Sequence, residues 1–138
     1  MGSVIIEEYV TINITEILPL YESVGWTNYT NRPDMLEASY KNSLKILAAW
    51  KNDKLIGVIR GVGDGNSILY IQDIIVLPEY QKQGIGKELI VALRKRYPNV
   101  YQTILLTQNQ PENVKFYESC GFSLSDRYNC AAFVIFAT

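Results

Sequence analysis

The stretch that decides the fold is VLPEYQKQGIGKELIVALRKRY, residues Val76 to Tyr97. Its apolar, strand-like start ends at Pro78, a polar turn follows, and Gly84 and Gly86 open a long amphipathic segment. Glycine adopts backbone angles that other residues resist, and it lacks the side chain that would keep a ligand away from the backbone. The first amides of a helix have no intrahelical acceptor and carry partial positive charge. The stretch therefore predicts a strand-turn-helix unit whose turn is shaped for a phosphate group.

Two widespread phosphate motifs do not fit this turn. A dinucleotide fingerprint requires a third glycine where Leu89 stands, and a P-loop requires Ser or Thr where Glu88 follows Lys87. The structural alternative is a tight turn that uses its glycines only for packing, and the glycine pair alone does not decide between the two.

Hydrophobic patterns on both sides of the turn predict one α/β domain over residues 1–138, with a mixed, mostly antiparallel sheet. The expected strands are 4–10, 45–50, 54–60, 67–77 and 101–108, the last of them buried, and the expected helices are 15–26, 32–44, 84–97 and 111–122. The tail, residues 122–138, is expected to form two closing strands around residues 126–129. No linker or internal repeat interrupts this order.

Composition excludes several classes of function. Thirteen basic and 14 acidic residues give a net charge of -1, so neither nucleic acid nor an anionic membrane surface is an expected partner. The chain has no histidine, which removes the commonest general base and zinc ligand, and Cys120 and Cys130 lack metal-ligand spacing, so no metal is expected. The start resembles no signal peptide and no apolar run spans a bilayer, which predicts a cytoplasmic protein.

Two motifs together resemble a known family. The pattern V-x-P-x-x-Q-x-x-G-x-G, from Val76 to Gly86, resembles the acetyl-coenzyme A signature of the GNAT superfamily of N-acetyltransferases. NVKFYESCGF, residues 113–122, resembles the later helix of that superfamily, and the order of elements matches over nearly the whole chain. The resemblance implies a sheet that splays between the strand before the turn and the next parallel strand, with helices on both faces.

The resemblance implies acetyl-coenzyme A as co-substrate. Its pyrophosphate would bind the turn, and its pantetheine arm would pair with the strand backbone, where one amide would face the thioester carbonyl as an oxyanion hole. The implied strand residues are Ile74, Ile75 and Val76, and the implied turn residues are Gln81, Lys82, Gln83, Gly84, Ile85, Gly86 and Lys87. An asparagine of the superfamily is replaced here by Gln110, so either Asn109 or Asn113 is expected to supply the amide contact.

Tyr117 aligns with the superfamily tyrosine that protonates the departing thiolate. A phenol suits this step because its high pKa keeps it protonated beforehand. The structural alternative is that Tyr117 packs on its helix beside Phe116.

Asp73 is the expected general base, acting through a water. It lies in the strand-like run YIQDIIVL, where alternation places it on one face with Ile71 and Ile75. A carboxylate on a core strand is costly unless it is paired or lines a cleft. The alternative is a structural carboxylate that pairs with a basic residue, and Glu22 and Glu37 would then be the next candidates for the base.

The two N-terminal helices and their loop lie where superfamily members build the acceptor pocket. Tyr21, Trp26 and Tyr29 are expected to form an aromatic wall for an amine, and Arg32 to bind a carboxylate. The alternative for each aromatic residue is an anchor that closes the core.

These observations predict an acetyl-coenzyme A-dependent N-acetyltransferase that acts on a small primary amine by direct attack in a ternary complex. A protein or peptide N-acetyltransferase and a non-catalytic coenzyme A-binding regulatory module are the alternatives. The apolar tail AAFVIFAT, residues 131–138, is expected to supply core and also a contact for a possible homodimer.

Overall fold

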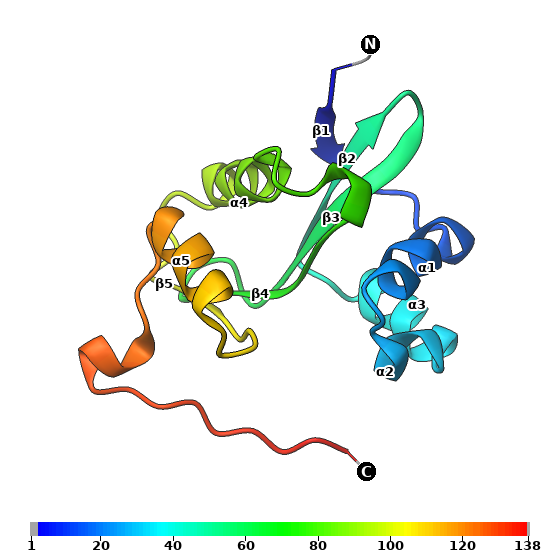
Figure 1. The fold of residues 1–138 in the computed structure, drawn as a ribbon. Coiled ribbons are helices and arrows are strands. Elements are labelled where there is room, and N and C mark those ends of the chain that lie inside the picture. Colours follow the sequence, from blue (N-terminus) through cyan, green and yellow to red (C-terminus); the bar gives the residue numbers. More distant parts are fainter. Residues whose placement is uncertain (1–2, 138) are drawn as a thin grey trace. The chain divides into compact units, whose positions relative to one another are not determined.

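The computed structural model describes residues 3–137 (Figure 1). The chain divides into two units, one ending at Leu106 and one beginning at Thr107, and each is described by itself. The first unit holds a five-stranded sheet with the order β1-β2-β3-β4-β5. Its strands are β1 (Ile5–Glu8), β2 (Lys45–Lys51), β3 (Lys54–Val62), β4 (Ile68–Val76) and β5 (Gln102–Leu105).

Neighbouring strands from β1 to β4 are antiparallel, and β5 is parallel to β4. This confirms the mixed, mostly antiparallel sheet that the sequence predicts. The helices of the first unit are α1 (Ile14–Ser23), α2 (Thr27–Thr30), α3 (Pro33–Lys41) and α4 (Ile85–Arg96), with a 3-10 turn η1 (Pro78–Tyr80) before α4. Helix α2 lies in a segment for which the sequence predicts a loop.

The two hairpins form because their turns contain residues that tolerate left-handed backbone. Asn52 and Asp53 join β2 to β3 with φ values of 50° and 64°, as a two-residue hairpin loop requires. Between β3 and β4, Gly63 has φ +125°, and a Cβ there would lie 2.5 Å from the carbonyl oxygen of Ile68. The carboxylate of Asp64 closes this turn by accepting hydrogen bonds from the backbone N–H groups of Asn66, Ser67 and Ile68.

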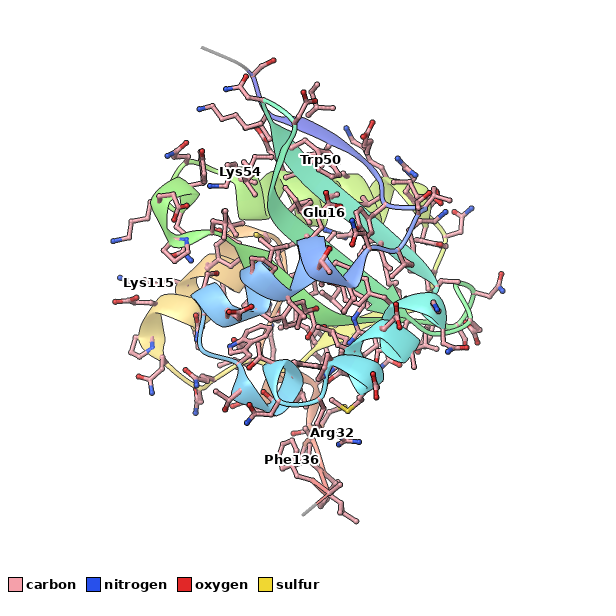
Figure 2. The ribbon with its side chains drawn as sticks, turned by 90° about the vertical axis from the view of Figure 1, so that its right-hand side faces the viewer. Glu16, Arg32, Trp50, Lys54, Lys115 and Phe136 are labelled. Carbon is pink, nitrogen blue, oxygen red and sulfur yellow. The ribbon has the colours of Figure 1, made fainter. Side chains whose placement is uncertain are left out.

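Helices cover both faces of the sheet. Figure 2 shows α1, α2 and α3 in front of the sheet and α4 behind it. Each main helix buries one apolar stripe: Ile17 and Leu20 from α1, Leu36 from α3, and Leu89, Ile90 and Leu93 from α4. Two hydrophobic layers therefore enclose the sheet, as the predicted helical patterns require.

Strands β4 and β5 pair over only part of β4. Their register runs from Ile68 opposite Gln102 to Ile71 opposite Leu105, and β4 then continues to Val76 without β5 beside it. The sheet therefore opens along the second half of β4, immediately before the glycine turn. Strand β5 is shorter than predicted, and its residues are exposed or half-buried, so the expectation of a buried strand here is wrong.

The second unit contains α5 (Pro111–Ser119) and a 3-10 turn η2 (Ser125–Tyr128). Helix α5 begins at a proline and is followed by Gly121 with φ +96°, as the sequence predicts. The prediction of two closing strands is wrong, because residues 120–137 contain no strand. Aromatic and β-branched residues favour strands, but a strand needs a ladder partner, and residues 131–137 make no backbone hydrogen bond within the described chain.

No helix within residues 3–137 has both the length and the apolar character needed to cross a bilayer.

Candidate functional site

The glycine turn takes the left-handed backbone that its sequence predicts. Lys82 has φ 63°, and Gly84, the N-cap of α4, has φ 86°. A Cβ at Gly84 would meet no atom within 4 Å, so close packing does not explain this glycine. Its backbone angle and its open surroundings explain it, which argues against the packing alternative.

The turn presents a row of unused hydrogen-bond donors. Gln81 donates its N–H to the carbonyl of Pro78 and Glu88 donates to Gly84, but the N–H groups of Lys82–Lys87 have no acceptor within the described residues. No side chain caps α4, a helix of 12 residues. Free amides at the positive end of a helix dipole bind anions. The turn therefore fits a pyrophosphate.

The open edge of β4 adjoins this turn. Leu77 donates its N–H to the carbonyl of Ile56 at 2.8 Å, and Ile75 stands opposite Val58. Because an antiparallel ladder alternates, Ile75 directs its backbone groups at β3, whereas Ile74 and Val76 direct theirs away from β3. Of the three strand residues implied by the resemblance, Ile74 and Val76 thus present backbone groups to the open edge.

Gln81 connects the strand to the turn. Its Nε2 donates a hydrogen bond to the carbonyl of Val76 at 2.9 Å. The side chain of Gln81 therefore positions the turn, and the Val76 N–H stays available at the open edge.

A β-bulge lies beside the open edge. Arg60 stands opposite Asp73 and Gly61 opposite Ile71, so Gln72 is the extra residue of β4. Its Nε2 donates to the Tyr29 hydroxyl at 3.2 Å. The sequence analysis missed Gln72, although the adjacent polar pair Gln-Asp inside an apolar strand marks the place.

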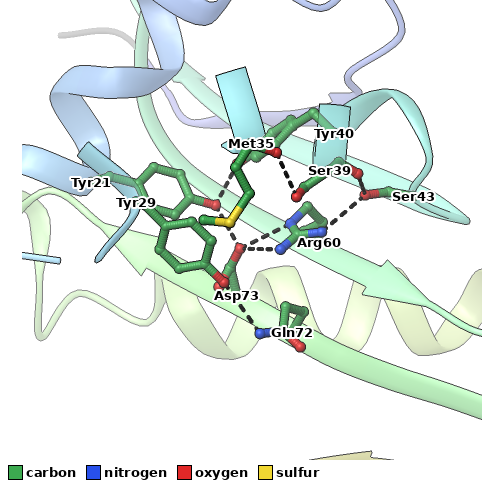
Figure 3. Close-up of polar contacts among 9 residues, drawn as sticks. All are labelled: Tyr21, Tyr29, Met35, Ser39, Tyr40, Ser43, Arg60, Gln72 and Asp73. Carbon is green, nitrogen blue, oxygen red and sulfur yellow. Dashed lines mark hydrogen bonds and ion pairs between the residues drawn. The ribbon is translucent and has the colours of Figure 1, made fainter. Parts of the chain in front are cut away.

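Asp73 is the centre of a buried polar cluster (Figure 3). One of its oxygens, Oδ2, lies 2.8 Å from Nη2 and 2.9 Å from Nε of Arg60, and it accepts a hydrogen bond of 2.7 Å from the Tyr21 hydroxyl. Asp73 is 3% exposed and Arg60 4%. The Tyr21 and Tyr40 hydroxyls are 2.9 Å apart, and Arg60 also donates to the Ser43 hydroxyl at 3.3 Å.

This arrangement matches the structural alternative for Asp73, a carboxylate paired with a basic residue. The general-base role of Asp73 stays a prediction. The sequence analysis missed Arg60, although a single arginine inside the apolar run LIGVIRGV signals a buried partner for Asp73.

The protonation states of the cluster follow from burial and charge. Burial raises the pKa of both the Tyr21 and the Tyr40 hydroxyls far above the usual range. Burial by itself lowers the pKa of Arg60, but the charge and hydrogen bond of Asp73 together with the nearby Tyr21 and Tyr29 outweigh it, so that the pKa is raised. Both tyrosines therefore stay hydrogen-bond donors, and the opposite charges of Arg60 and Asp73 compensate each other.

The expected aromatic wall exists as a cluster of three rings. Ring centroids of Tyr21 and Tyr29 are 5.0 Å apart, and Trp26 lies 5.9 Å from Tyr21 and 6.3 Å from Tyr29. Tyr21 is fully buried, whereas Trp26 and Tyr29 are half-buried. Burial, followed by the charge of Asp73, raises the pKa of Tyr29.

The remaining charged candidates of the first unit lie outside these contacts. Arg32 is exposed at the N-cap of α3, Glu22 is exposed on α1, and Glu37 is half-buried on α3. In the part of the chain that the structure describes, none of the three forms an ion pair or a side-chain hydrogen bond.

Tyr117 lies on α5 in the second unit. Its ring packs edge-on against Phe116 and Phe122, with centroids at 5.0 and 6.0 Å. Burial raises the pKa of the Tyr117 hydroxyl, nearby Cys120 raises it further, and a hydrogen bond with Thr107 lowers it. The hydroxyl is therefore protonated at neutral pH, as a general acid must be before its step.

The amide side chains near α5 differ in their availability. Asn113 donates its Nδ2 to the carbonyl of Gln108 at 3.0 Å. Asn109 is exposed, and so is Gln110, which caps α5 without a side-chain hydrogen bond. Of the two predicted residues, Asn109 thus has the side-chain amide that is more readily available for a contact with the pantetheine arm.

No group of three or more potential ligands within residues 3–137 is arranged to hold a metal ion. Cys120 is buried and Cys130 is exposed.

The first unit is thus an α/β structure in which a mixed sheet opens beside a helix terminus that no side chain caps. The family model described as acetyltransferase (GNAT) domain matches residues 17–137. The chain belongs to this family of N-acetyltransferases. The resemblance given by the two sequence motifs is thereby confirmed.

Solved and curated relatives agree with this assignment. A GNAT family acetyltransferase from Streptococcus pneumoniae is 38% identical, with a TM-score of 0.90 over 98% of each chain. An uncharacterized N-acetyltransferase from Prochlorococcus marinus is 32% identical over 89% of this chain and 69% of its own length. The chain spans 62% to 69% of the first four curated relatives.

An aminoglycoside N-acetyltransferase solved in complex with coenzyme A has a TM-score of 0.72 over 100% of this chain and 95% of its own. At 18% identity, that likeness shows the fold alone.

Proposed function

We propose that this chain transfers the acetyl group of acetyl-coenzyme A to a small primary amine, by direct attack in a ternary complex. The observation that carries the proposal is the row of acceptor-free amides from Lys82 to Lys87, which adjoins the open edge of β4. A helix terminus alone would bind any anion. The added strand edge offers ladder positions to an extended, amide-containing arm such as pantetheine.

The residues of the first unit would divide the binding between them. The N–H groups of Lys82–Lys87 hold the pyrophosphate, with Gln81 fixing the turn to the strand. The backbone groups of Ile74 and Val76 pair with the pantetheine arm, and one of these amides faces the thioester carbonyl. A fixed N–H dipole aimed at that oxygen stabilises the negative charge that develops during attack.

Acetyl-coenzyme A supplies an activated acyl group on a sulfur leaving group. In the transfer, the amine nitrogen forms a bond to the carbonyl carbon, the carbon–sulfur bond breaks, and the thiolate takes a proton. Tyr117 donates that proton, since its hydroxyl stays protonated at neutral pH. The ammonium proton leaves through water, with Asp73 as the predicted base.

The acceptor site is assigned to the surface formed by Trp26, Tyr29 and Gln72. Two half-buried aromatic rings attract a cationic amine, and Gln72 reaches the Tyr29 hydroxyl from the bulge of β4. The amine would thus lie at the point where the sheet opens. A compact aromatic cluster of this kind suits a small amine.

The test is a screen of amines with acetyl-coenzyme A that measures release of free thiol and confirms each acetylated product by mass spectrometry. Small polyamines, amino sugars and amino acids form one panel, and peptides with free N-termini or lysines form the other. Turnover with the small-amine panel alone supports the proposal. Turnover confined to peptides favours the protein acetyltransferase, and coenzyme A binding without turnover favours the regulatory module.

A further inference from the structure

Gln72 and Asp73 are neighbours in β4 whose side chains lie on the same face of the sheet, which strict strand alternation excludes. Ile71 stands opposite Gly61, where a Cβ would point toward α4, so Ile71 faces α4. Asp73, two positions later, instead accepts a hydrogen bond from a side chain of α1. The β-bulge at Gln72 causes this change of face. It also turns the Gln72 side chain toward α2, where Nε2 reaches Tyr29.

The Tyr29 hydroxyl lies between Gln72 and Asp73. Gln72 donates its Nε2 hydrogen to the Tyr29 oxygen at 3.2 Å. Figure 3 shows that oxygen beside the Asp73 carboxylate, and after burial the charge of Asp73 and a hydrogen bond with it raise the pKa of Tyr29. The contacts of Asp73 with Arg60 and Tyr21 all use Oδ2, which leaves Oδ1 available to Tyr29. Because a carboxylate only accepts hydrogen bonds, Tyr29 donates its proton to Asp73.

The directions of these hydrogen bonds decide what the site offers to a ligand. A phenolic oxygen has one proton and two lone pairs. The proton of Tyr29 points at Asp73 and one lone pair accepts from Gln72, which leaves the second lone pair for a ligand. Donation to a buried carboxylate strengthens that oxygen as an acceptor. The side-chain carbonyl of Gln72, an exposed residue, offers a second acceptor beside it.

The half-buried rings of Trp26 and Tyr29 add a preference for positive charge. Two hydrogen-bond acceptors next to two ring faces suit a cation that carries several N–H groups. A quaternary ammonium has the same charge but no hydrogen to donate, so it would use the rings alone.

We propose that Tyr29 and Gln72 select a primary ammonium group, which donates one N–H to the Tyr29 oxygen and another to the Gln72 carbonyl oxygen, with its apolar body against Trp26. The third N–H gives its proton to water before attack. The nitrogen lone pair then appears on the side that these two bonds do not use, while the bonds keep the nitrogen in place. This inference rests on the proposed function, because it concerns the acceptor site of that reaction.

The experiment is calorimetry in saturating coenzyme A with two probes, 2-phenylethylamine and its N,N,N-trimethyl analogue. Both probes carry one positive charge and one aromatic ring, and only the first has N–H groups to donate. The parent should bind the primary amine roughly ten- to a hundredfold more tightly, the range expected for hydrogen bonds from a charged group. In Tyr29→Phe and in Gln72→Leu, the ratio of the two affinities should fall toward equality.

The matched controls are Tyr101→Phe and Gln102→Leu, which remove the same groups from exposed residues of the first unit and should leave the ratio unchanged. A merely structural role of Tyr29 or Gln72 would weaken both probes alike. An unchanged ratio in the Tyr29→Phe and Gln72→Leu variants therefore overturns the inference, and so does a parent that binds neither probe or binds both equally.

The amine screen separates this inference from the proposed function. Turnover by a chain whose affinity ratio does not respond to the two substitutions would retain acetyl transfer and reject only the selection by Tyr29 and Gln72. A ratio that responds in a chain without turnover would retain the ammonium site and reject acetyl transfer.

Discussion

Arg60 and Asp73 stand directly opposite each other on β3 and β4, and two nitrogens of the guanidinium approach the same carboxylate oxygen, at 2.8 and 2.9 Å. Both side chains are buried, and the Tyr21 hydroxyl donates to that same oxygen. The pair links the two central strands beneath the aromatic rings of the proposed acceptor site. Substitutions in this pair therefore test whether Asp73 has a structural or a catalytic role.

Asp73→Asn keeps the size of the side chain and removes its charge, which leaves Arg60 buried without compensation. Breaking a buried pair in this way should lower the free energy of unfolding by about 3–5 kcal/mol, measured by urea denaturation. The double variant Arg60→Met, Asp73→Leu is the control and should recover most of that loss. If Asp73 is structural, the ratio of kcat/KM between folded variant and parent stays flat with pH. A ratio that recovers at alkaline pH, where the amine is already deprotonated, would establish Asp73 as the base.

Gly84→Ala tests the phosphate site against a matched glycine. Gly84 and Gly25 both have left-handed φ values, and a Cβ at either would meet no atom within 4 Å. Alanine at each position should therefore cost a similar amount of stability, about 1 kcal/mol. Only Gly84→Ala should weaken coenzyme A binding, by tenfold or more in calorimetry. Equal coenzyme A affinity in the two variants would remove the turn from the proposed site.

Tyr117→Phe keeps the ring and removes the proton donor. It should lower kcat roughly a hundred- to ten-thousandfold and leave the affinity for coenzyme A nearly unchanged. Tyr128→Phe, at an exposed tyrosine of the same unit, is the control and should be as fast as the parent. Because burial raises the pKa of Tyr117, the activity of the parent should persist to a higher pH than a free phenol would allow. A Tyr117→Phe variant with full kcat would show that water protonates the thiolate.

Asp64 gives a prediction about acid stability. Hydrogen bonds from the Ser67 hydroxyl and the backbone amides of the turn lower the pKa of its carboxyl below the ordinary range. A depressed folded-state pKa contributes stability above the unfolded value of about 3.9, and this contribution is lost as the pH falls further. Asp64→Ala should therefore be less stable than the parent at neutral pH, and the gap should narrow below about pH 4. Melting temperatures across the acid range measure this, and a gap that is constant with pH would assign the effect to something other than the charge of Asp64.

The regular elements of the first unit follow closely from local signals. The alternation of apolar residues in β2, β3 and β4, the hairpin turn at Asn52 and Asp53, and the amphipathic pattern of α4 each point to one structure. The same holds for the glycine turn, because a left-handed glycine and an uncapped helix are local properties. Family membership followed from two such motifs at a fixed separation.

The features that the sequence did not predict depend on contacts between distant parts of the chain, which no local pattern encodes. Gln72 reaches Tyr29 only because β4 bulges, and the pairing of Arg60 with Asp73 depends on the register of two strands. The prediction of closing strands was wrong for a related reason: the tail has the composition of a strand, but a strand also needs a ladder partner, which composition does not supply.

The buried Arg60–Asp73 pair between β3 and β4 also disfavours incorrect strand registers while the chain folds. A hairpin that slips by two residues keeps its apolar face inward, so hydrophobic burial alone tolerates the error. In that slipped arrangement Arg60 would stand opposite an isoleucine, and two charges would enter the core without partners, at a cost of several kcal/mol for each ion. A hairpin in the wrong register is therefore unstable and reopens. A newly synthesised chain thus avoids a long-lived misfolded state that its otherwise apolar strands would permit.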